Sequence, residues 1–185
     1  MSEKINVSQI VKLHFSTFQN EAGKISWTDW ATLVFLPAII AMILSAYKVA
    51  VSNSVYANII MAGALFTGLL LNLLVLVYDQ KIKILDKNIK GDNAEYVSYA
   101  IRKKVINETH NNISYSVIVS LLIVVFSTIG SFDFCGLIEK QLFNYEFTFN
   151  FRVWLINFPL YFLCIHLVVL ILMILKRVHL LISSH

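Results

Sequence analysis

Four apolar segments, each close to or longer than the roughly 20 residues that a helix needs to cross a bilayer, dominate this sequence. They run over about Trp30–Tyr47, Tyr56–Tyr78, Ile113–Ile129 and Val153–Leu175. We expect the third segment, which is the shortest, to take residues from its flanks. The 185-residue chain is 58% hydrophobic and only 14% charged, outside the range of soluble globular proteins. The sequence therefore predicts one all-α membrane domain over residues 1–185 with four transmembrane helices.

Lysine and arginine are distributed unevenly among the segments outside these spans. Of the 15 such residues, only Lys48, Lys140 and Arg152 fall in the loops after the first and third spans. The other 12 lie in the N-terminal segment, in residues 79–112 and in the C-terminal segment. Because loops rich in Lys and Arg remain in the cytoplasm, both termini and residues 79–112 are predicted to be cytoplasmic. The basic composition thus indicates orientation, and direct nucleic-acid binding is not expected.

The N-terminal segment, residues 1–25, carries apolar residues at helical spacing, namely Val7, Val11, Phe15 and Phe18. This pattern predicts a short amphipathic helix lying on the inner membrane surface.

The first span shows a capping signal and a break. Ser26 and Asp29 have the spacing of a capping box, which predicts that the span begins there. Pro37 is expected to kink the span one to two turns inside, since proline cannot donate a backbone hydrogen bond.

Residues 79–112 continue the helical pattern beyond the membrane. Tyr78, Ile82 and Leu85 form an apolar stripe that extends the second span, and a second stripe leads back into the third. This predicts a cytoplasmic helical hairpin whose apolar side contacts either its other arm or a neighbouring subunit. Lipid contact or solvation is the favoured reading of the basic run Arg102–Lys104, with a protein partner as the alternative. The expected partner-binding residues are Ile82, Leu85, Lys87, Lys90, Arg102 and Lys103.

Polar and small residues inside the spans predict close helix packing. His166 is the only ionisable residue deep in a span, and we expect a neutral imidazole bonded to another helix rather than a gate or sensor. The small and polar residues could instead line a narrow polar path, but packing within or between subunits is favoured. The residues concerned are Gly63, Ala64, Gly68, Asn72, Ser116, Ser120 and His166.

Aromatic residues alternate with polar ones in the loop before the fourth span. Such period-2 spacing predicts a strand with all rings on one face. It could pair with Ser131–Phe134 as a small extracytoplasmic β element within the loop 131–152. Its surface is read as an aromatic belt at the membrane interface, or else as a recognition surface or a contact between subunits. The aromatic residues are Phe143, Tyr145, Phe147, Phe149 and Phe151.

Residues able to support catalysis or metal binding do not occur in a recognisable pattern. Cys135 and Cys164 form no CxxC or Cys/His spacing, and there is no Gly-rich phosphate loop. No metal site, cofactor or enzymatic activity is expected.

The plan of four spans in under 200 residues, with an inward basic hairpin, resembles the membrane subunit of Kiwa, a prokaryotic anti-phage defence system. The accessory membrane proteins of type VI-B CRISPR loci are similar in size. The resemblance to Kiwa implies a tetramer in the bacterial inner membrane that carries a cytoplasmic partner protein, and it transfers no site residue. It further implies a sensor of phage-associated disturbance.

Two other functions are left open. The first is an oligomeric pore that depolarises the membrane, lined by Asn72, Ser116, Ser120 and Ser127. The second is a small-solute transporter, which the sparse set of intramembrane polar residues disfavours.

Overall fold

A computed structural model describes residues 7–18, 26–47, 51–86, 94–132 and 153–183, and the regular structure in these ranges is helical throughout. No strand occurs in the described ranges. The elements in chain order are α1 (Val7–Ser16), α2 (Trp27–Trp30), η1 (Ala31–Phe35), α3 (Leu36–Ala46), α4 (Asn53–Asp86), α5 (Ala94–Ser131), η2 (Val153–Asn157) and α7 (Phe158–Ser183). Here η denotes a π-helical segment.

Four helices are long and apolar enough to cross a membrane, which confirms the four predicted spans. They cover Trp27–Ala46, Asn53–Leu85, Tyr99–Ser131 and Trp154–His179. The third apolar segment does extend into its flanks, since α5 continues on both sides of residues 113–129.

Two predicted features lie wholly or partly outside the described residues. The alternating aromatic strand, residues 143–152, lies outside them, as does the middle of the predicted hairpin 79–112, because residues 87–93 are not described. The two arms that flank the turn are helical, as the ends of α4 and α5. Ser131, the first residue of the predicted short strand partner, is instead the last residue of α5. The predicted strand therefore cannot start at Ser131.

The chain divides into two compact units. Unit 1 consists of Met1–Trp27, Gly68–Ile118 and Leu170–His185, and unit 2 consists of Thr28–Thr67 and Val119–Val169. Helices α4, α5 and α7 each contribute one part to unit 1 and another part to unit 2.

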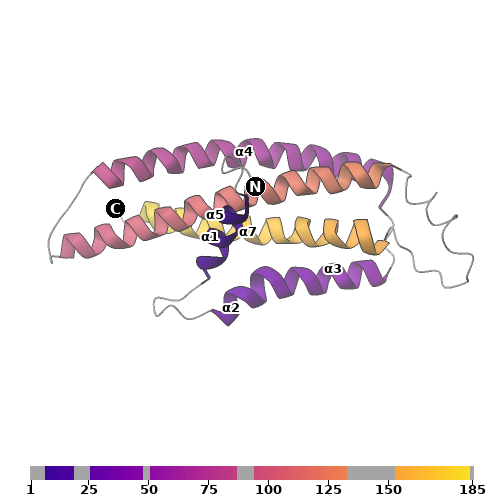
Figure 1. Ribbon diagram of the computed structural model, residues 1–185, viewed down its shortest axis with the longest axis horizontal. Coiled ribbons are helices and arrows are strands. Elements are labelled where there is room, and N and C mark those ends of the chain that lie inside the picture. The colour runs from indigo at the N-terminus through magenta and orange to yellow at the C-terminus, as the bar shows by residue number, and fades with distance from the viewer. Residues whose placement is uncertain (1–6, 19–25, 48–50, 87–93, 133–152, 184–185) are drawn as a thin grey trace, which may run out of the picture. The chain divides into compact units, whose positions relative to one another are not determined.

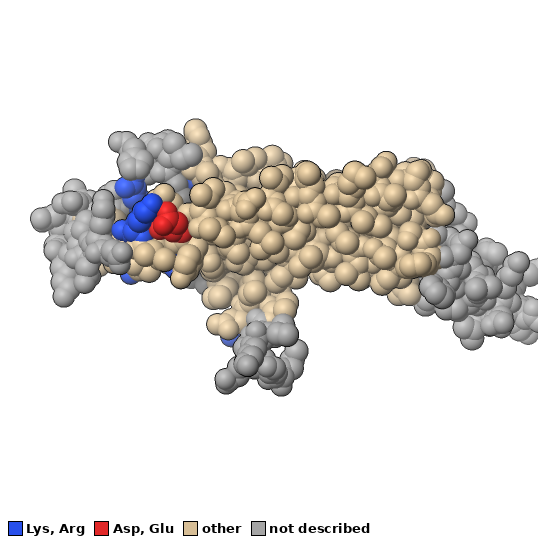
Figure 2. Space-filling view, turned by 90° about the horizontal axis from the view of Figure 1, so that it is seen from above, with Lys and Arg blue, Asp and Glu red and all other residues tan. Residues whose placement is uncertain are grey.

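Charged residues are concentrated in unit 1. Among the described residues of unit 2, Asp29 is the only Asp, Glu, Lys or Arg. On the face shown in Figure 2, blue and red atoms lie together in one area, and a few further blue atoms are visible apart from it. Unit 2 thus has the composition of a segment that is surrounded by hydrocarbon.

The first span contains a π-helical turn directly before its proline. α2, η1 and α3 form one continuous run of helix, visible in Figure 1. Pro37 follows the end of η1 by two residues, and the N–H of Leu36 donates to the carbonyl of Ala31, five residues earlier. Since Pro37 has no N–H to continue the α-helical ladder, a wider turn accommodates it. The distortion predicted at Pro37 therefore takes the form of a π-helical segment.

The fourth span begins in the same way. η2 ends at Asn157, and Pro159 again follows by two residues. In both spans the proline leaves the carbonyl four residues earlier, that of Leu33 or Leu155, without its α-helical donor. Each π-helical segment can therefore be traced to one proline in the sequence.

Candidate functional site: polar contacts between the spans

His166 of α7 supplies the hydrogen bond that Pro37 removes from the first span. Its Nδ1 lies 2.6 Å from the carbonyl oxygen of Leu33, within η1. A carbonyl can only accept, so Nδ1 carries the hydrogen and donates it. The imidazole is 1% exposed and stacks on the ring of Phe162, with centroids 5.4 Å apart. In this structure His166 therefore bonds to the helix of the first span.

A second polar contact joins α4 to the start of the fourth span. The hydroxyl of Tyr56 donates to Oδ1 of Asn157 over 2.6 Å, and both residues are buried. Gly130 on α5 makes room for this ring, because a Cβ at Gly130 would lie 2.5 Å from Cε1 of Tyr56. A side chain at Gly130 and the tyrosine ring therefore exclude each other.

The close approach of α4 and α5 depends on Gly63. A Cβ at this position would lie 2.8 Å from a methyl carbon of Val124. Four residues later, the hydroxyl of Thr67 donates to the Gly63 carbonyl at 2.8 Å and lies 2.8 Å from the hydroxyl of Ser120. The predicted roles of Gly63 and Ser120 in helix packing agree with these contacts.

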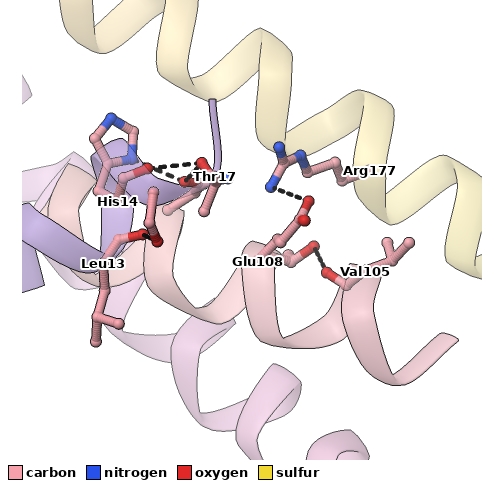
Figure 3. A network of polar contacts seen from close by, with 9 residues as sticks. Leu13, His14, Thr17, Val105, Glu108 and Arg177 are labelled. Atoms are coloured by element: carbon pink, nitrogen blue, oxygen red, sulfur yellow. Dashed lines mark hydrogen bonds and ion pairs between the residues drawn. The ribbon is translucent and has the colours of Figure 1, made fainter. Parts of the chain in front are cut away.

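Unit 1 contains a buried polar cluster where α1 meets α5. His14 is fully buried, with Nδ1 2.8 Å from Oδ1 of Asn112, and its ring stacks on Tyr115 at 3.9 Å between centroids. The hydroxyl of Thr17 donates to the His14 carbonyl at 2.7 Å and lies 3.2 Å from the same Asn112 oxygen. Figure 3 shows His14 and Thr17 side by side. Polar side chains, together with buried Phe18, thus attach α1 to the chain.

An ion pair joins α5 and α7 in the same unit. Arg177 lies 3.1 Å from a carboxylate oxygen of Glu108, and both side chains are mostly covered (Figure 3). The pair Lys83–Asp79 on α4 is also close, at 2.6 Å, but both of its side chains are more than half exposed. Of these two pairs, Glu108–Arg177 is therefore the one that can stabilise helix packing.

Three of the predicted packing residues are exposed in this chain. Ala64, Gly68 and Asn72 lie on the exposed side of α4. Nothing lies within 4 Å of a Cβ built on Gly68. Ser116, in contrast, is fully buried and donates to the Asn112 carbonyl of its own helix. The predicted packing set is thus divided between an internal group and an exposed stripe.

The predicted partner-binding residues lie at the ends of α4 and α5. Ile82 is 41% exposed and Leu85 43% exposed, so the apolar stripe is not covered by the described part of the other arm. Arg102 is half-buried and Lys103 is exposed, with its Nζ 6.0 Å from the Tyr99 ring centre. Lys87 and Lys90 lie outside the described residues.

Several of these contacts were not predicted from the sequence. His14 lies in α1, whereas Asn112 and Tyr115 lie in α5, almost 100 residues later, and no local pattern relates them. The sequence did indicate that the Leu33 carbonyl needs a donor from elsewhere, since Leu33 lies four residues before Pro37 within a predicted span. That rule indicates where a donor is needed but does not identify which residue supplies it.

Neither a metal centre nor a relative accounts for these contacts. The described ranges contain no group of three or more His, Cys, Asp or Glu side chains suited to hold a metal ion. Comparisons with models of protein families, with curated proteins and with solved structures found no match to this chain.

Proposed function

We propose that this chain is an oligomeric subunit of an anti-phage defence system in the bacterial inner membrane, and that it anchors and signals to a cytoplasmic protein. The observation that carries the proposal is the uncovered apolar stripe on the end of α4. Ile82 and Leu85 are both more than 40% exposed there, in a segment that also carries Lys81 and Lys83. An apolar stripe bordered by basic residues suits a protein partner with an apolar centre and an acidic rim.

The lengths of the helices support a signalling route through them. α4 has 34 residues and α5 has 38, whereas about 20 are enough to cross the bilayer. A displacement at one end of a continuous helix therefore moves the partner-binding end as well. Gly63, Thr67 and Ser120, which hold α4 against α5, would couple the movement of the two helices.

Capture of the partner tests this proposal. The chain with Lys87, Lys90, Arg102 and Lys103 changed to Glu, and separately the variant Ile82→Ser with Leu85→Ser, should lose a cytoplasmic protein that the unchanged chain retains. Lys12→Glu, an exposed change on α1, is the matched control and should retain it. Equal recovery with all variants, at equal membrane levels, would refute a partner on this surface.

The proposed orientation places both termini in the cytoplasm, supported by the concentration of charge in unit 1. A reporter that is active only in the cytoplasm should then be active when fused after His185, and a reporter that is active only in the periplasm should be inactive there. Cys135 should react with a membrane-impermeant maleimide in intact spheroplasts. Periplasmic activity of the reporter would reverse the orientation and place the apolar stripe outside the cell.

The alternative of an oligomeric pore would require the serines of α5 to face a shared lumen. Ser116, Ser120 and Ser127 are each fully buried within the chain. We therefore favour the signalling subunit. Loss of membrane potential on expression of this chain alone, followed with a voltage-sensitive dye, would support the pore instead.

A further inference from the structure

The amide of Asn72 is a polar group in the second span to which the described part of the fold gives no hydrogen-bond partner. Asn72 lies six residues before Tyr78, well inside the second span, and its side chain is exposed on α4. Within the described chain it makes no hydrogen bond. An amide in hydrocarbon finds no water, so it needs a donor and an acceptor from outside this chain.

The internal contacts of α4 show that the amide points away from its own chain. Tyr56, Gly63, Leu70 and Val77 are the buried positions of this helix and recur every seven residues along one side. Asn72 is nine residues beyond Gly63, which places it about 180° around the helix at roughly 100° per residue. A change of rotamer cannot bring its amide to another span of this chain.

The surroundings of Asn72 permit a second helix to approach closely. Ala64 and Gly68 precede it at four-residue steps on the same side, and both are exposed. Val75, one turn further, is 68% exposed. Ala64, Gly68, Asn72 and Val75 are together named the Asn72 face. Small residues at this spacing let two backbones approach, so that a side-chain amide can bond across the interface.

We propose that the Asn72 face binds the same face of a second copy of this chain. A two-fold axis along the membrane normal places Asn72 opposite Asn72, where each amide donates through Nδ2 and accepts through Oδ1. The group is thus self-complementary, whereas a different protein would have to supply a matching donor and acceptor. α4 is also the span least covered by its own chain, with 11% of its apolar window buried against 22% to 44% in the others.

This proposal concerns the oligomer within the proposed function, and it can fail or succeed independently of the signalling role. A two-fold contact makes a pair, and two such pairs would form the tetramer. Cross-linking in native membranes tests the contact without any partner protein. Partner capture, in contrast, depends on residues at the cytoplasmic end of the helix.

The test uses single cysteines in a background in which Cys135 and Cys164 are changed to Ala. Val75→Cys should form a disulfide-linked homodimer on mild oxidation, whereas Phe66→Cys should not. Phe66 is also exposed on α4, about 120° away from Asn72 around the helix. Adding Asn72→Leu should weaken association of the Val75→Cys chain by about tenfold in a dilution series in detergent, because two interhelical hydrogen bonds are lost.

Two further variants separate loss of contact from loss of fold. Gly68→Ile should abolish the cross-link while the chain still folds, because no atom of the chain is near a Cβ at this position. Asn72→Gln, which keeps the amide, should retain part of the cross-link. Equal cross-linking of Val75→Cys and Phe66→Cys, no effect of Asn72→Leu, or a cross-link to another protein would each overturn the proposal.

Discussion

Nδ1 of His166 lies 2.6 Å from the carbonyl oxygen of Leu33, in the place of the N–H that Pro37 cannot supply. The fourth span thus provides a hydrogen-bond donor for a backbone carbonyl of the first span. Since the interaction is buried, its loss would leave an acceptor without a partner in hydrocarbon.

This relationship predicts that the effects of His166 and Pro37 are coupled. His166→Leu should lower the free energy of unfolding by about 2 kcal/mol, because a buried carbonyl loses its donor. In a Pro37→Ala background, residue 37 can donate to Leu33 instead, so the same change should be about 1 kcal/mol less damaging. Titration with a denaturing detergent would measure the free energy of unfolding of the unchanged chain, of each single variant and of the double variant. If the effects of the two substitutions on the free energy of unfolding were additive, His166 would not be replacing the donor that is missing at Pro37.

Gly130 and Gly68 should respond in opposite ways to the same added methyl group. Gly130→Ala should destabilise the protein by about 1–3 kcal/mol, since its Cβ would overlap the Tyr56 ring. Gly68→Ala is the matched control, because it adds the same methyl group where no neighbouring helix of the same chain lies, and it should leave the unfolding free energy of the monomer in detergent unchanged or raise it. The measurement is again detergent-induced unfolding. Equal effects at the two glycines would show that Tyr56 does not depend on Gly130.

The attachment of α1 should depend on His14 rather than on its exposed apolar residues. His14→Ala removes the imidazole that bonds Asn112 and stacks on Tyr115, and should therefore release the helix. Limited trypsin digestion would then cut after Lys12 faster than in the unchanged chain. Leu13→Ala alters a neighbouring side chain that is 41% exposed, and it should leave the digestion rate unchanged.

The ion pairs Glu108–Arg177 and Asp79–Lys83, both between described residues of unit 1, should differ in their contribution to stability. Glu108→Gln should lower the free energy of unfolding by about 1 kcal/mol, because Arg177 remains in a largely covered position. Asp79→Asn, in the exposed pair with Lys83, should change it by less than about 0.5 kcal/mol. Exchanging the charges with Glu108→Arg and Arg177→Glu should restore part of the loss. A larger effect at Asp79 would reverse this ranking.

The spans could be predicted because the bilayer requires length and apolarity, and both can be read locally. The contacts between spans could not be predicted in this way, because they join residues that are far apart in the sequence. Pro37 indicated that the first span would be distorted, but its rescue by His166 joins residues more than 130 positions apart. His166, as a lone imidazole in an apolar helix, was predicted to bond to another helix, and the structure identifies Leu33 as the acceptor.

The N-terminal helix shows where the sequence pattern was incomplete. Its apolar residues Val7, Val11 and Phe15 suggested contact with the membrane surface, and that role is still a prediction. Its docking, however, uses His14 and Thr17, which lie outside the apolar pattern. Polar residues of α1 could not be assigned because their partner, Asn112, is almost 100 residues away. The exposed position of Asn72 likewise depends on which side of α4 faces the chain.

The wide turn before Pro37 also sets the rotational phase of everything that precedes it. A π-helical turn holds about one residue more than an α-helical one, so the residues before it are rotated by about 100° relative to α3. Removing one residue from η1 would return Trp27 and Trp30 to the α-helical register and turn them to another side of the span. One proline thereby determines the direction in which the aromatic start of this chain's first membrane helix faces.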